Sequence, residues 1–436
     1  MSNMDRTYQR THPWIRFELD LRRLPPDLWM TLGECRSKCE HIAGVPLSPD
    51  WDQQLHAVYL AKGTAATTAI EGNTLTEEQV LQQIKGELVV PASKEYLKQE
   101  VANILNGFNS ILAEIAKGRV PALTRQRIEM FNATILHKLD LVNDKAVPGQ
   151  IRDHSVGVER ANYRGAPAED CEYLVDRLCD WLNVMEFPDD FLSAGAMIKA
   201  VLAHLYLAWI HPFGDGNGRT ARLIEVQILM CSGIPSPAAH LLSNHYNDTR
   251  TEYYAQLNRA SKSGGDVVPF LLYALRGFRD GLRQQIQYVK TLQHKIAWTN
   301  YVHEAFSGRK SVSDHRRRRL ALELADHPNG VKLDAVKTIN GVIALEYASK
   351  TGRTLMRDLR ELSELKLITV RDRIVFPNRD LILAFLPVRA RLEKREKATV
   401  NPKPIAMNDS SPRPSAASES PHLTSPTGHE ETVTGR

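Results

Sequence analysis

The feature that most constrains the fold is an apolar stretch, AGAMIKAVLAHLYLAWI at residues 194–210, which leads directly into a glycine-rich loop. The stretch is shorter than a bilayer-spanning helix requires and contains Lys199 and His204, so it is predicted to be a helix buried in protein. The loop HPFGDGNGRTAR follows, and after it comes a second helical pattern, LIEVQILMC. We therefore expect a buried helix, a glycine loop and another helix in the middle of the chain, and no contact with a membrane.

Composition favours an ordinary multidomain globular protein. The 436 residues are 42% hydrophobic and 25% charged, which is enough chain for two or three cores. The first thirty residues contain no apolar run of signal-peptide length. The five cysteines are an odd number without a CxxC pair, which is typical of free thiols. The expected location is the reducing cytoplasm.

Apolar residues recur every three or four positions along most of the chain, which predicts a mainly α protein. Near the C-terminus, helical patterns are followed by ITVRDRIVFP, two β-prone runs around a polar turn, as in a winged helix-turn-helix. The last residues are rich in Pro, Ser and Thr. The predicted order is a helical N-terminal region at 1–120, a helical core at 121–285, a connecting helix at 286–310, a winged helix-turn-helix at 311–390 and a disordered tail at 399–436.

The glycine loop has the chemistry of a polyphosphate site. Its glycines allow successive backbone N–H groups to converge on an anion at the start of the next helix. Arg219 and Arg222 lie three residues apart on one face of that helix, where they can clamp phosphate oxygens. Asp215 would repel a bare anion, so it implies a hard cation such as Mg²⁺. His211 is the residue best suited to accept a hydroxyl proton near neutral pH.

The loop resembles the complete signature HxFx(D/E)GNGRxxR of the Fic family, with no departure at any motif position. The resemblance implies a mostly helical Fic-type fold and transfer of AMP from Mg-ATP to a Ser, Thr or Tyr hydroxyl of a target protein, and to the enzyme itself. By motif position, His211 would be the catalytic base and Asp215 the metal ligand. The nucleotide's phosphates would be bound by the residues that follow, which are Gly216, Asn217, Gly218, Arg219, Thr220 and Arg222.

Two further segments resemble parts of the same family. The stretch SVGVERANYRGAP, with its alternating valines, predicts a short β-hairpin where the family has a flap, so Val156, Gly157, Val158 and Glu159 would border the nucleotide. An ordinary hairpin is the alternative. Downstream, TEYYAQLNRASKSGGD resembles the region that lines the adenine, which points to Tyr253 and Tyr254. Adjacent helical tyrosines also suit a core position.

The string TTAIEGNTLT resembles the family's inhibitory motif (S/T)xxxE(G/N), with Thr67, Glu71 and Gly72 at the matching positions. A carboxylate apposed to Arg222 would occupy the guanidinium that should bind the γ-phosphate of ATP. We therefore expect Glu71 to inhibit the transferase. The alternative is that Glu71 is a solvated acid near a helix end.

Residues 309–399 contain 21 Lys/Arg and 12 Asp/Glu, a net +9 in a chain whose total is +5. Six of these basic residues lie on or near the predicted recognition helix or at the wing: Lys350, Arg353, Arg357, Arg360, Arg371 and Arg373. This pattern fits contact with DNA, although winged helices also dock proteins. The run HRRRR at 315–319 also fits a solvated helix face.

The sequence leaves a second function open, that of a DNA-binding regulator whose Fic core senses a nucleotide. The same site also fits removal of AMP, or the use of another nucleotide. The target protein and a homodimeric state cannot be decided from the sequence.

Overall fold

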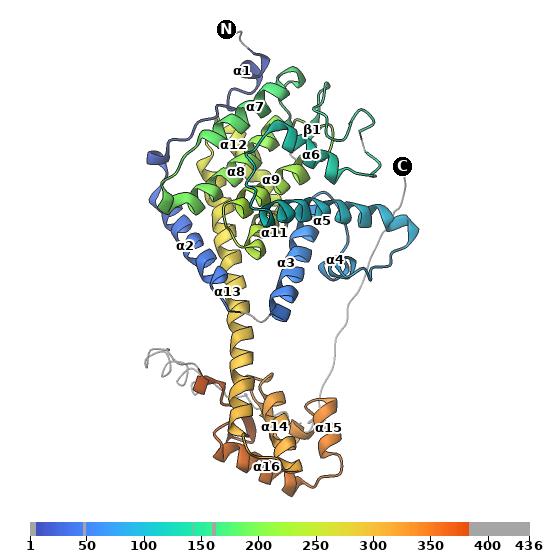
Figure 1. Cartoon of the computed structure of the whole chain (residues 1–436), viewed down its shortest axis with the longest axis vertical. Coiled ribbons are helices and arrows are strands. Elements are labelled where there is room, and N and C mark those ends of the chain that lie inside the picture. The colour runs from blue at the N-terminus through green and yellow to red at the C-terminus, as the bar shows by residue number, and fades with distance from the viewer. Residues whose placement is uncertain (1–5, 47–48, 142, 159–162, 383–436) are drawn as a thin grey trace, which may run out of the picture. The chain divides into compact units, whose positions relative to one another are not determined.

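The computed structural model of the chain describes residues 6–46, 49–141, 143–158 and 163–382. The chain divides into two compact units, Met1–Ile296 and Ala297–Arg436 (Figure 1). The predicted mainly α fold is confirmed, because helices dominate both units. The unit boundary falls within one continuous helix, α13, rather than in a loop. The predicted tail at 399–436 lies outside the described residues.

Five helices form the N-terminal part of the first unit: α1 Thr7–Thr11, α2 Pro26–Ala43, α3 Pro49–Ala69, α4 Glu77–Ile84 and α5 Glu95–Ala116. Their starts follow ordinary capping chemistry. Pro26 occupies the first position of α2, and Thr76 and Gln79 form a reciprocal capping box at α4. The end of α3 and the body of α5 supply the carboxylates discussed below.

The rest of this unit consists of α6 Arg125–Ile135, α7 Ala168–Val184, α8 Leu192–Ile210, α9 Asn217–Cys231, α10 Ser236–Ala239, α11 Leu241–Asp248, α12 Arg250–Lys262 and α13 Val268–Ala305. The hairpin formed by β1 (Gly157–Val158) and β2 (Tyr163–Arg164) lies between α6 and α7. Its register pairs Gly157 with Arg164 and Val158 with Tyr163. A β excursion therefore interrupts the helices where the sequence predicts one.

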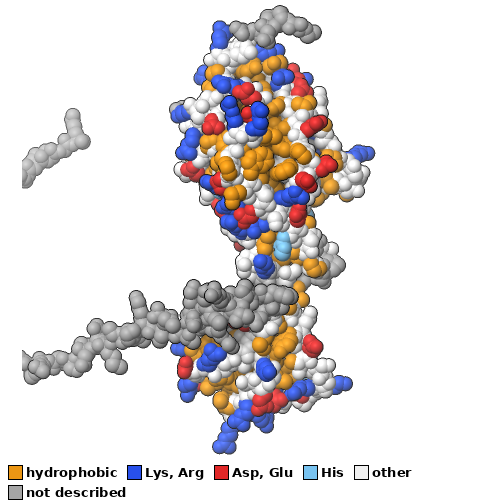
Figure 2. All heavy atoms as spheres, turned by 90° about the vertical axis from the view of Figure 1, so that its left-hand side faces the viewer, with side chains coloured by type: hydrophobic (Ala, Val, Ile, Leu, Met, Phe, Trp, Pro, Cys, Tyr) orange, Lys and Arg blue, Asp and Glu red, His pale blue; other side chains and the backbone are white. Residues whose placement is uncertain are grey.

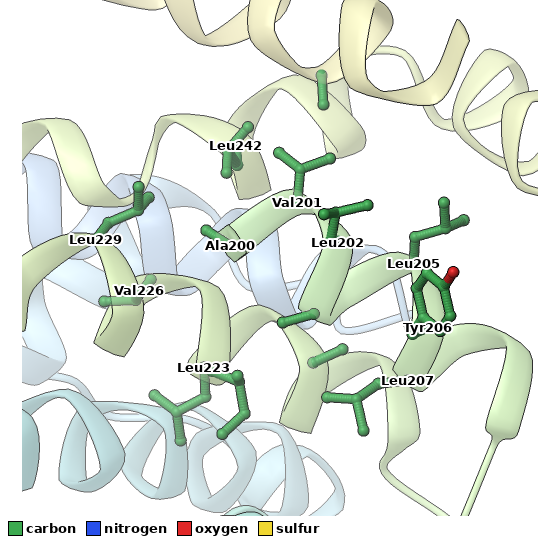
Figure 3. Close-up of a cluster of buried hydrophobic side chains, with 14 of the residues drawn as sticks. Ala200, Val201, Leu202, Leu205, Tyr206, Leu207, Leu223, Val226, Leu229 and Leu242 are labelled. Carbon is green, nitrogen blue, oxygen red and sulfur yellow. The ribbon is translucent and has the colours of Figure 1, made fainter. Parts of the chain in front are cut away.

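Helix α8 is the centre of the first unit. The segment Asp189–Ile210 is long and apolar enough to cross a membrane by length and composition, but 72% of its apolar window is buried inside protein. Figure 3 shows Ala200, Leu202 and Leu205 of α8 within a cluster that also contains Leu223 and Val226 of α9. A helix that is apolar on every face is expected in such a core.

The second unit has its own core around Trp298, Val302 and Phe306, the last residues of α13 and the loop beyond. Its elements are α14 Val312–Leu324, β3 Val331–Lys332, α15 Gly341–Tyr347, α16 Gly352–Glu364, β4 Ile368–Arg371 and β5 Ile374–Pro377. The three strands form an antiparallel sheet in the order β3-β5-β4. The β4-β5 turn contains two residues with positive φ, Asp372 at 49° and Arg373 at 60°, as a tight hairpin requires.

A buried charge cluster ties the helices of the second unit together. Asp358 of α16 is completely buried. Its carboxylate accepts hydrogen bonds from Arg316 Nε at 2.9 Å, from Arg317 Nε at 2.9 Å and from the Tyr347 hydroxyl at 3.0 Å. Because both oxygens of the buried carboxylate are satisfied, the cluster fixes α14, α15 and α16 in one arrangement.

We expect Leu202→Ala to destabilise the first unit by about 2 to 5 kcal/mol, because it opens a cavity in a core that cannot fully collapse. The measurement is urea unfolding followed by tryptophan fluorescence. Leu192→Ala is the matched control, because Leu192 belongs to the same helix but is 55% exposed. Equal shifts for the two variants would contradict the central position of α8.

Candidate active site

His211 ends α8 with an unusual backbone conformation. Its φ of 52° and ψ of 58° are in the left-handed region, and its N–H donates to the Leu207 carbonyl. Such a conformation is costly for a residue that is not glycine and is often found at functional sites. Burial lowers the pKa of His211 to about 4, and the positive charge of Arg152 acts in the same direction. The imidazole is therefore neutral at physiological pH and able to accept a proton.

Arg152 is a buried support of the turn that the sequence did not single out. Its guanidinium donates to the carbonyl of His211 at 2.7 Å and to that of His154 at 2.6 Å. It also donates to the carbonyls of Ala166 and Ile210. The Arg152 side chain thus links the backbone after the hairpin to the backbone at the end of α8. Its positive charge lies beside the His211 imidazole. Within GQIRDHS nothing marks this arginine as different from an exposed one.

Helix α9 begins at Asn217, directly after Gly216 at a φ of 77°. The Asn217 side chain is occupied by the loop itself: its Oδ1 accepts from Phe213 N at 2.9 Å and its Nδ2 donates to the Phe213 carbonyl at 2.8 Å. Asn217 can therefore serve a phosphate through its backbone N–H, while its amide shapes the loop. The free N–H groups of this first turn form a ready anion site.

Asn132 of α6 holds the other side of the loop and was not anticipated. Its Nδ2 donates to the Asp215 carbonyl at 3.0 Å and to Thr220 Oγ1 at 3.2 Å. The Thr220 hydroxyl is therefore buried and bonded to Asn132.

Arg222 is almost completely buried, with 1% of its side chain exposed. Its Nη2 donates to Glu71 Oε1 at 2.6 Å and to the Thr67 carbonyl at 3.0 Å. Its Nε and Nη1 are buried without a hydrogen-bond partner among the described residues. Unsatisfied buried donors are rare, and a ligand rich in acceptor oxygens would satisfy these two.

Glu71 follows the C-terminal end of α3, where Gly72 at a φ of 110° turns the chain. Partial burial raises the pKa of Glu71, but the charges of Arg222 and Arg219 and the hydrogen bond from Arg222 outweigh it and hold the pKa below its usual value. The side chain is 32% exposed, so water screens this ion pair. The carboxylate is charged, bonded to Arg222 and accessible to displacement.

Arg219 is held by two carboxylates. Its Nη1 donates to Glu100 of α5, and its Nη2 donates to Asp215 Oδ1 at 3.0 Å. Its Nε is buried and lacks a partner within the part of the chain that the structure describes. Glu100 is a third residue that sequence reasoning missed, because one acid among the charged residues of KEYLKQE carries no distinguishing signal.

The donor set at Asp215 suits a metal that a substrate brings with it. No group of three or more His, Cys, Asp or Glu residues within 6–46, 49–141, 143–158 and 163–382 is arranged to hold a metal ion alone. Asp215 offers one partly exposed carboxylate, whose Oδ1 is engaged by Arg219 and by the N–H of Gly216. Mg²⁺ is commonly held by one or two carboxylates together with substrate phosphates, so Asp215 fits this role.

A pocket brings together residues that are far apart in the sequence. The residues of its lining that the sequence singled out are Glu71, His211, Gly218, Arg222, Tyr253 and Tyr254. The absence of a Cβ at Gly218 leaves the space that the Glu71 carboxylate fills. An anion-binding end and an aromatic end therefore share one cavity.

The two tyrosines differ in their roles. Tyr253 is buried, and its hydroxyl forms a 2.8 Å hydrogen bond with His204 Nε2. His204 Nδ1 lies 3.1 Å from Glu225 Oε2 in the same buried network. Tyr254 is only half buried, so its ring is the more accessible aromatic surface of the pocket.

The hairpin is formed, and its second strand contributes Tyr163 to the lining of this pocket. Val156 accepts a backbone hydrogen bond from Gly165 N at 3.1 Å, and Gly157 pairs with Arg164. Among the described residues, neither Val156 nor Gly157 lines the pocket. Glu159 lies outside the described residues, and Val158 is placed only through its backbone pairing.

The chain is similar in sequence to a known protein family and to several curated proteins. Residues 122–229 match the sequence model of the Fic/DOC family. "Protein adenylyltransferase fic-1" of Caenorhabditis elegans is 32% identical over 236 residues, which are 53% of this chain and 42% of that protein. "Protein adenylyltransferase Fic" of Nematostella vectensis is 28% identical over 214 residues, 48% of this chain and 45% of that protein. The chain thus spans less than half the length of these curated relatives.

Among solved structures, a Fic family protein from Desulfovibrio desulfuricans G20 matches with a TM-score of 0.52 at 20% sequence identity. The match covers 81% of this chain and 96% of that one. This likeness concerns the fold, and it confirms the Fic-type helical architecture predicted from the sequence.

We expect the His211 imidazole to titrate near pH 4 in the wild-type protein. Because this folded-state pKa lies below the usual value, the group stabilises the fold above about pH 6.5, and that contribution is lost as the pH falls toward 4. NMR of ¹³C-labelled histidine checks this, with the resonance assigned by its loss in His211→Ala. A midpoint near 6.5 would contradict the buried, neutral state.

Proposed function

Residues 122–229 of this chain form a domain of the Fic/DOC family, and from this premise we propose that the protein is an adenylyltransferase restrained by its own Glu71. It transfers AMP from Mg-ATP to a Ser, Thr or Tyr hydroxyl of a target protein, and to itself. The observation that carries the proposal is the convergence of a neutral His211, a helix N-terminus and a buried Arg222 in one pocket.

The reaction needs a base and a site that stabilises phosphate charge. His211 accepts the proton of the target hydroxyl as its oxygen bonds to the α-phosphorus, and the bond from this phosphorus to the β-phosphate oxygen breaks to release pyrophosphate. A magnesium ion held by Asp215 would neutralise phosphate charge. The N–H groups that open α9 act on the same charge, and no covalent enzyme intermediate is required.

The arginines divide the polyphosphate between them. Arg222, with two unpartnered donors among the described residues, suits the terminal phosphate, and Arg219 suits the inner phosphates. The Glu71 carboxylate occupies Arg222 Nη2, so ATP must displace it before the γ-phosphate can bind. This competition is the physical basis of the proposed autoinhibition.

The same site supports an alternative direction. Removal of AMP would use Glu71 to orient a water molecule, so the restraint of the forward reaction would assist the reverse one. Use of another nucleotide is also compatible with the loop, whose backbone and arginines contact phosphates rather than the base.

We expect Glu71→Gly to raise label transfer from α-labelled ATP by about tenfold or more, since it frees a charged donor that the γ-phosphate needs. Adding His211→Ala should lower the rate of this variant by about 10²-fold or more through loss of the base. The measurement compares α- and γ-labelled ATP with Mg²⁺ on the protein itself and on lysate. Label from γ would indicate phosphoryl transfer, and an unchanged rate in Glu71→Gly would refute the inhibition.

Location in a reducing cytoplasm is part of the proposal. All five cysteines are free, and four are buried. Burial raises the pKa of Cys39 to about 12 and that of Cys171 to about 11, so these thiols are unreactive packing residues.

The second unit supports a further role as a winged helix that contacts DNA. Its order of helix, short strand, two helices and hairpin suits that motif. Arg353, Arg357 and Arg360 are exposed on α16, at spacings of four and three that align them on one face. The visible face of this unit in Figure 2 carries Lys and Arg side chains along its margins.

The acids of α16 neutralise only part of its positive field, because Glu364 is the one exposed acid among them. Asp358 is buried against Arg316 and Arg317, and Glu361 pairs with Arg309 at 2.6 Å. The three exposed arginines take part in no ion pair with any residue that the structure describes. Cations that the fold leaves free suit the regularly spaced phosphates of a duplex.

We expect the double variant Arg353→Ala/Arg357→Ala to reduce the slope of log affinity against log salt for duplex DNA by about two, one for each lost phosphate contact. Fluorescence anisotropy at several salt concentrations measures this slope. Arg22→Ala is the control, because it removes a charge from an exposed arginine of the other unit. Absence of DNA binding at low salt would assign this face to a protein partner.

A further inference from the structure

Glu100 is a carboxylate at the phosphate loop that belongs neither to the loop nor to the segment around Glu71. It lies in the first half of α5, with 15% of its side chain exposed, and accepts a hydrogen bond from Arg219 Nη1. Arg219 itself is 8% exposed. A charge-assisted bond between two mostly buried groups is stronger than a surface ion pair, so it restrains the arginine.

Asn73 connects Glu100 to the turn that presents Glu71. Its Nδ2 donates to Glu100 Oε2 at 2.9 Å and to the Leu97 carbonyl at 3.0 Å. Its Oδ1 accepts from Leu75 N at 3.0 Å. The amide is thus fully engaged, and any shift of the α3 end that withdraws Glu71 also disturbs the bond to Glu100.

The two arginines of the loop are held in parallel ways. Arg222 bonds to Glu71 in the turn after α3, and Arg219 bonds to Glu100 in α5; both carboxylates precede the loop in the chain. We propose that Glu100 is a second restraint on nucleotide binding, which occupies Arg219 as Glu71 occupies Arg222, and that Asn73 couples the two.

The balance of charge favours competition over support. Three carboxylates, on Glu71, Glu100 and Asp215, surround two guanidinium groups in the ligand-free arrangement. An incoming polyphosphate meets this excess of negative charge, and Mg²⁺ would relieve it only at Asp215. If Glu100 mainly positioned Arg219 for phosphate, its removal would weaken nucleotide binding, whereas a competing Glu100 makes binding tighter when it is removed.

The inference rests on the proposed function, and it is tested by binding rather than by transfer. Isothermal titration with Mg²⁺ and α,β-methylene-ATP, which cannot release pyrophosphate, measures affinity without turnover. The full-length variants are Glu71→Gly, Glu100→Gln, Glu100→Ala and the double variant Glu71→Gly/Glu100→Gln. Glu114→Gln is the matched control, because Glu114 lies in α5, like Glu100, and forms a partly buried ion pair with Arg127 of α6.

We expect both Glu100 variants to bind the analogue about threefold to tenfold more tightly, since one charge-assisted bond no longer competes. ADP should gain by the same factor in these variants, because Arg219 faces the inner phosphates, whereas Glu71→Gly should favour the triphosphate over ADP. The double variant should gain less than the product of the separate gains, because Asn73 links the two restraints. Glu114→Gln should leave both affinities unchanged.

Unchanged or weaker binding in both Glu100 variants, with Glu71→Gly still tightened, would overturn the second restraint and leave the proposed function intact. A simple product of gains in the double variant would overturn the coupling through Asn73. Failure of Glu71→Gly itself to bind either nucleotide would overturn the proposed function, and the inference with it.

Discussion

The site depends on one packing constraint, the burial of the C-terminal half of α8. Because nearly every residue from Ala200 to Ile210 is buried, other elements pack closely around this half of the helix, and its last residue lies inside the protein instead of at the surface. The left-handed turn at His211 then directs the chain back into α9, which packs along α8. The residues of the candidate site thus owe their positions to the burial of an apolar helix.

Burial also explains why charge is arranged so carefully around the loop. Arg152, Arg219 and Arg222 are all buried cations, and each would be costly without acceptors. Arg152 is satisfied by backbone carbonyls and so acts as structure. Arg219 and Arg222 are satisfied only in part, and by carboxylates that a stronger anion can replace. The same side-chain type, arginine, thus has fixed backbone partners at Arg152 and carboxylate partners that a ligand can replace at Arg219 and Arg222.

Sequence reasoning succeeded where a residue's type and its neighbours determine its role. The apolar run predicts α8 and the glycines predict the break before α9, and the structure has both, while the roles that the motif gives to His211 and Arg222 stay predictions. It could not find Arg152, Asn132 or Glu100, because their partners are backbone atoms or residues 59, 83 and 119 positions away. Such contacts depend on the tertiary packing of helices, which leaves no local pattern in the chain.

The motif predicts which residues bind phosphate, but it does not say whether the side chain or the backbone of each residue does so. Asn217 and Thr220 lie within the loop as expected, but their side chains bond to Phe213 and Asn132. The side chain at a motif position can therefore stabilise the conformation of the loop. For the hairpin, the alternation of Val156 and Val158 predicted a β excursion, but the hairpin residue that lines the pocket is Tyr163 of β2.

The separate carboxylates on Arg219 and Arg222 have a consequence for how this protein can change by mutation. A single base substitution converts a glutamate codon into one for glycine or glutamine, so one mutation is enough to remove either carboxylate–arginine ion pair. Since Glu71 and Glu100 lie on different segments and grip different arginines, one such step still leaves the other arginine paired. Under the proposed function, the transferase would therefore be buffered against accidental activation, and release of both arginines would require two independent genetic events.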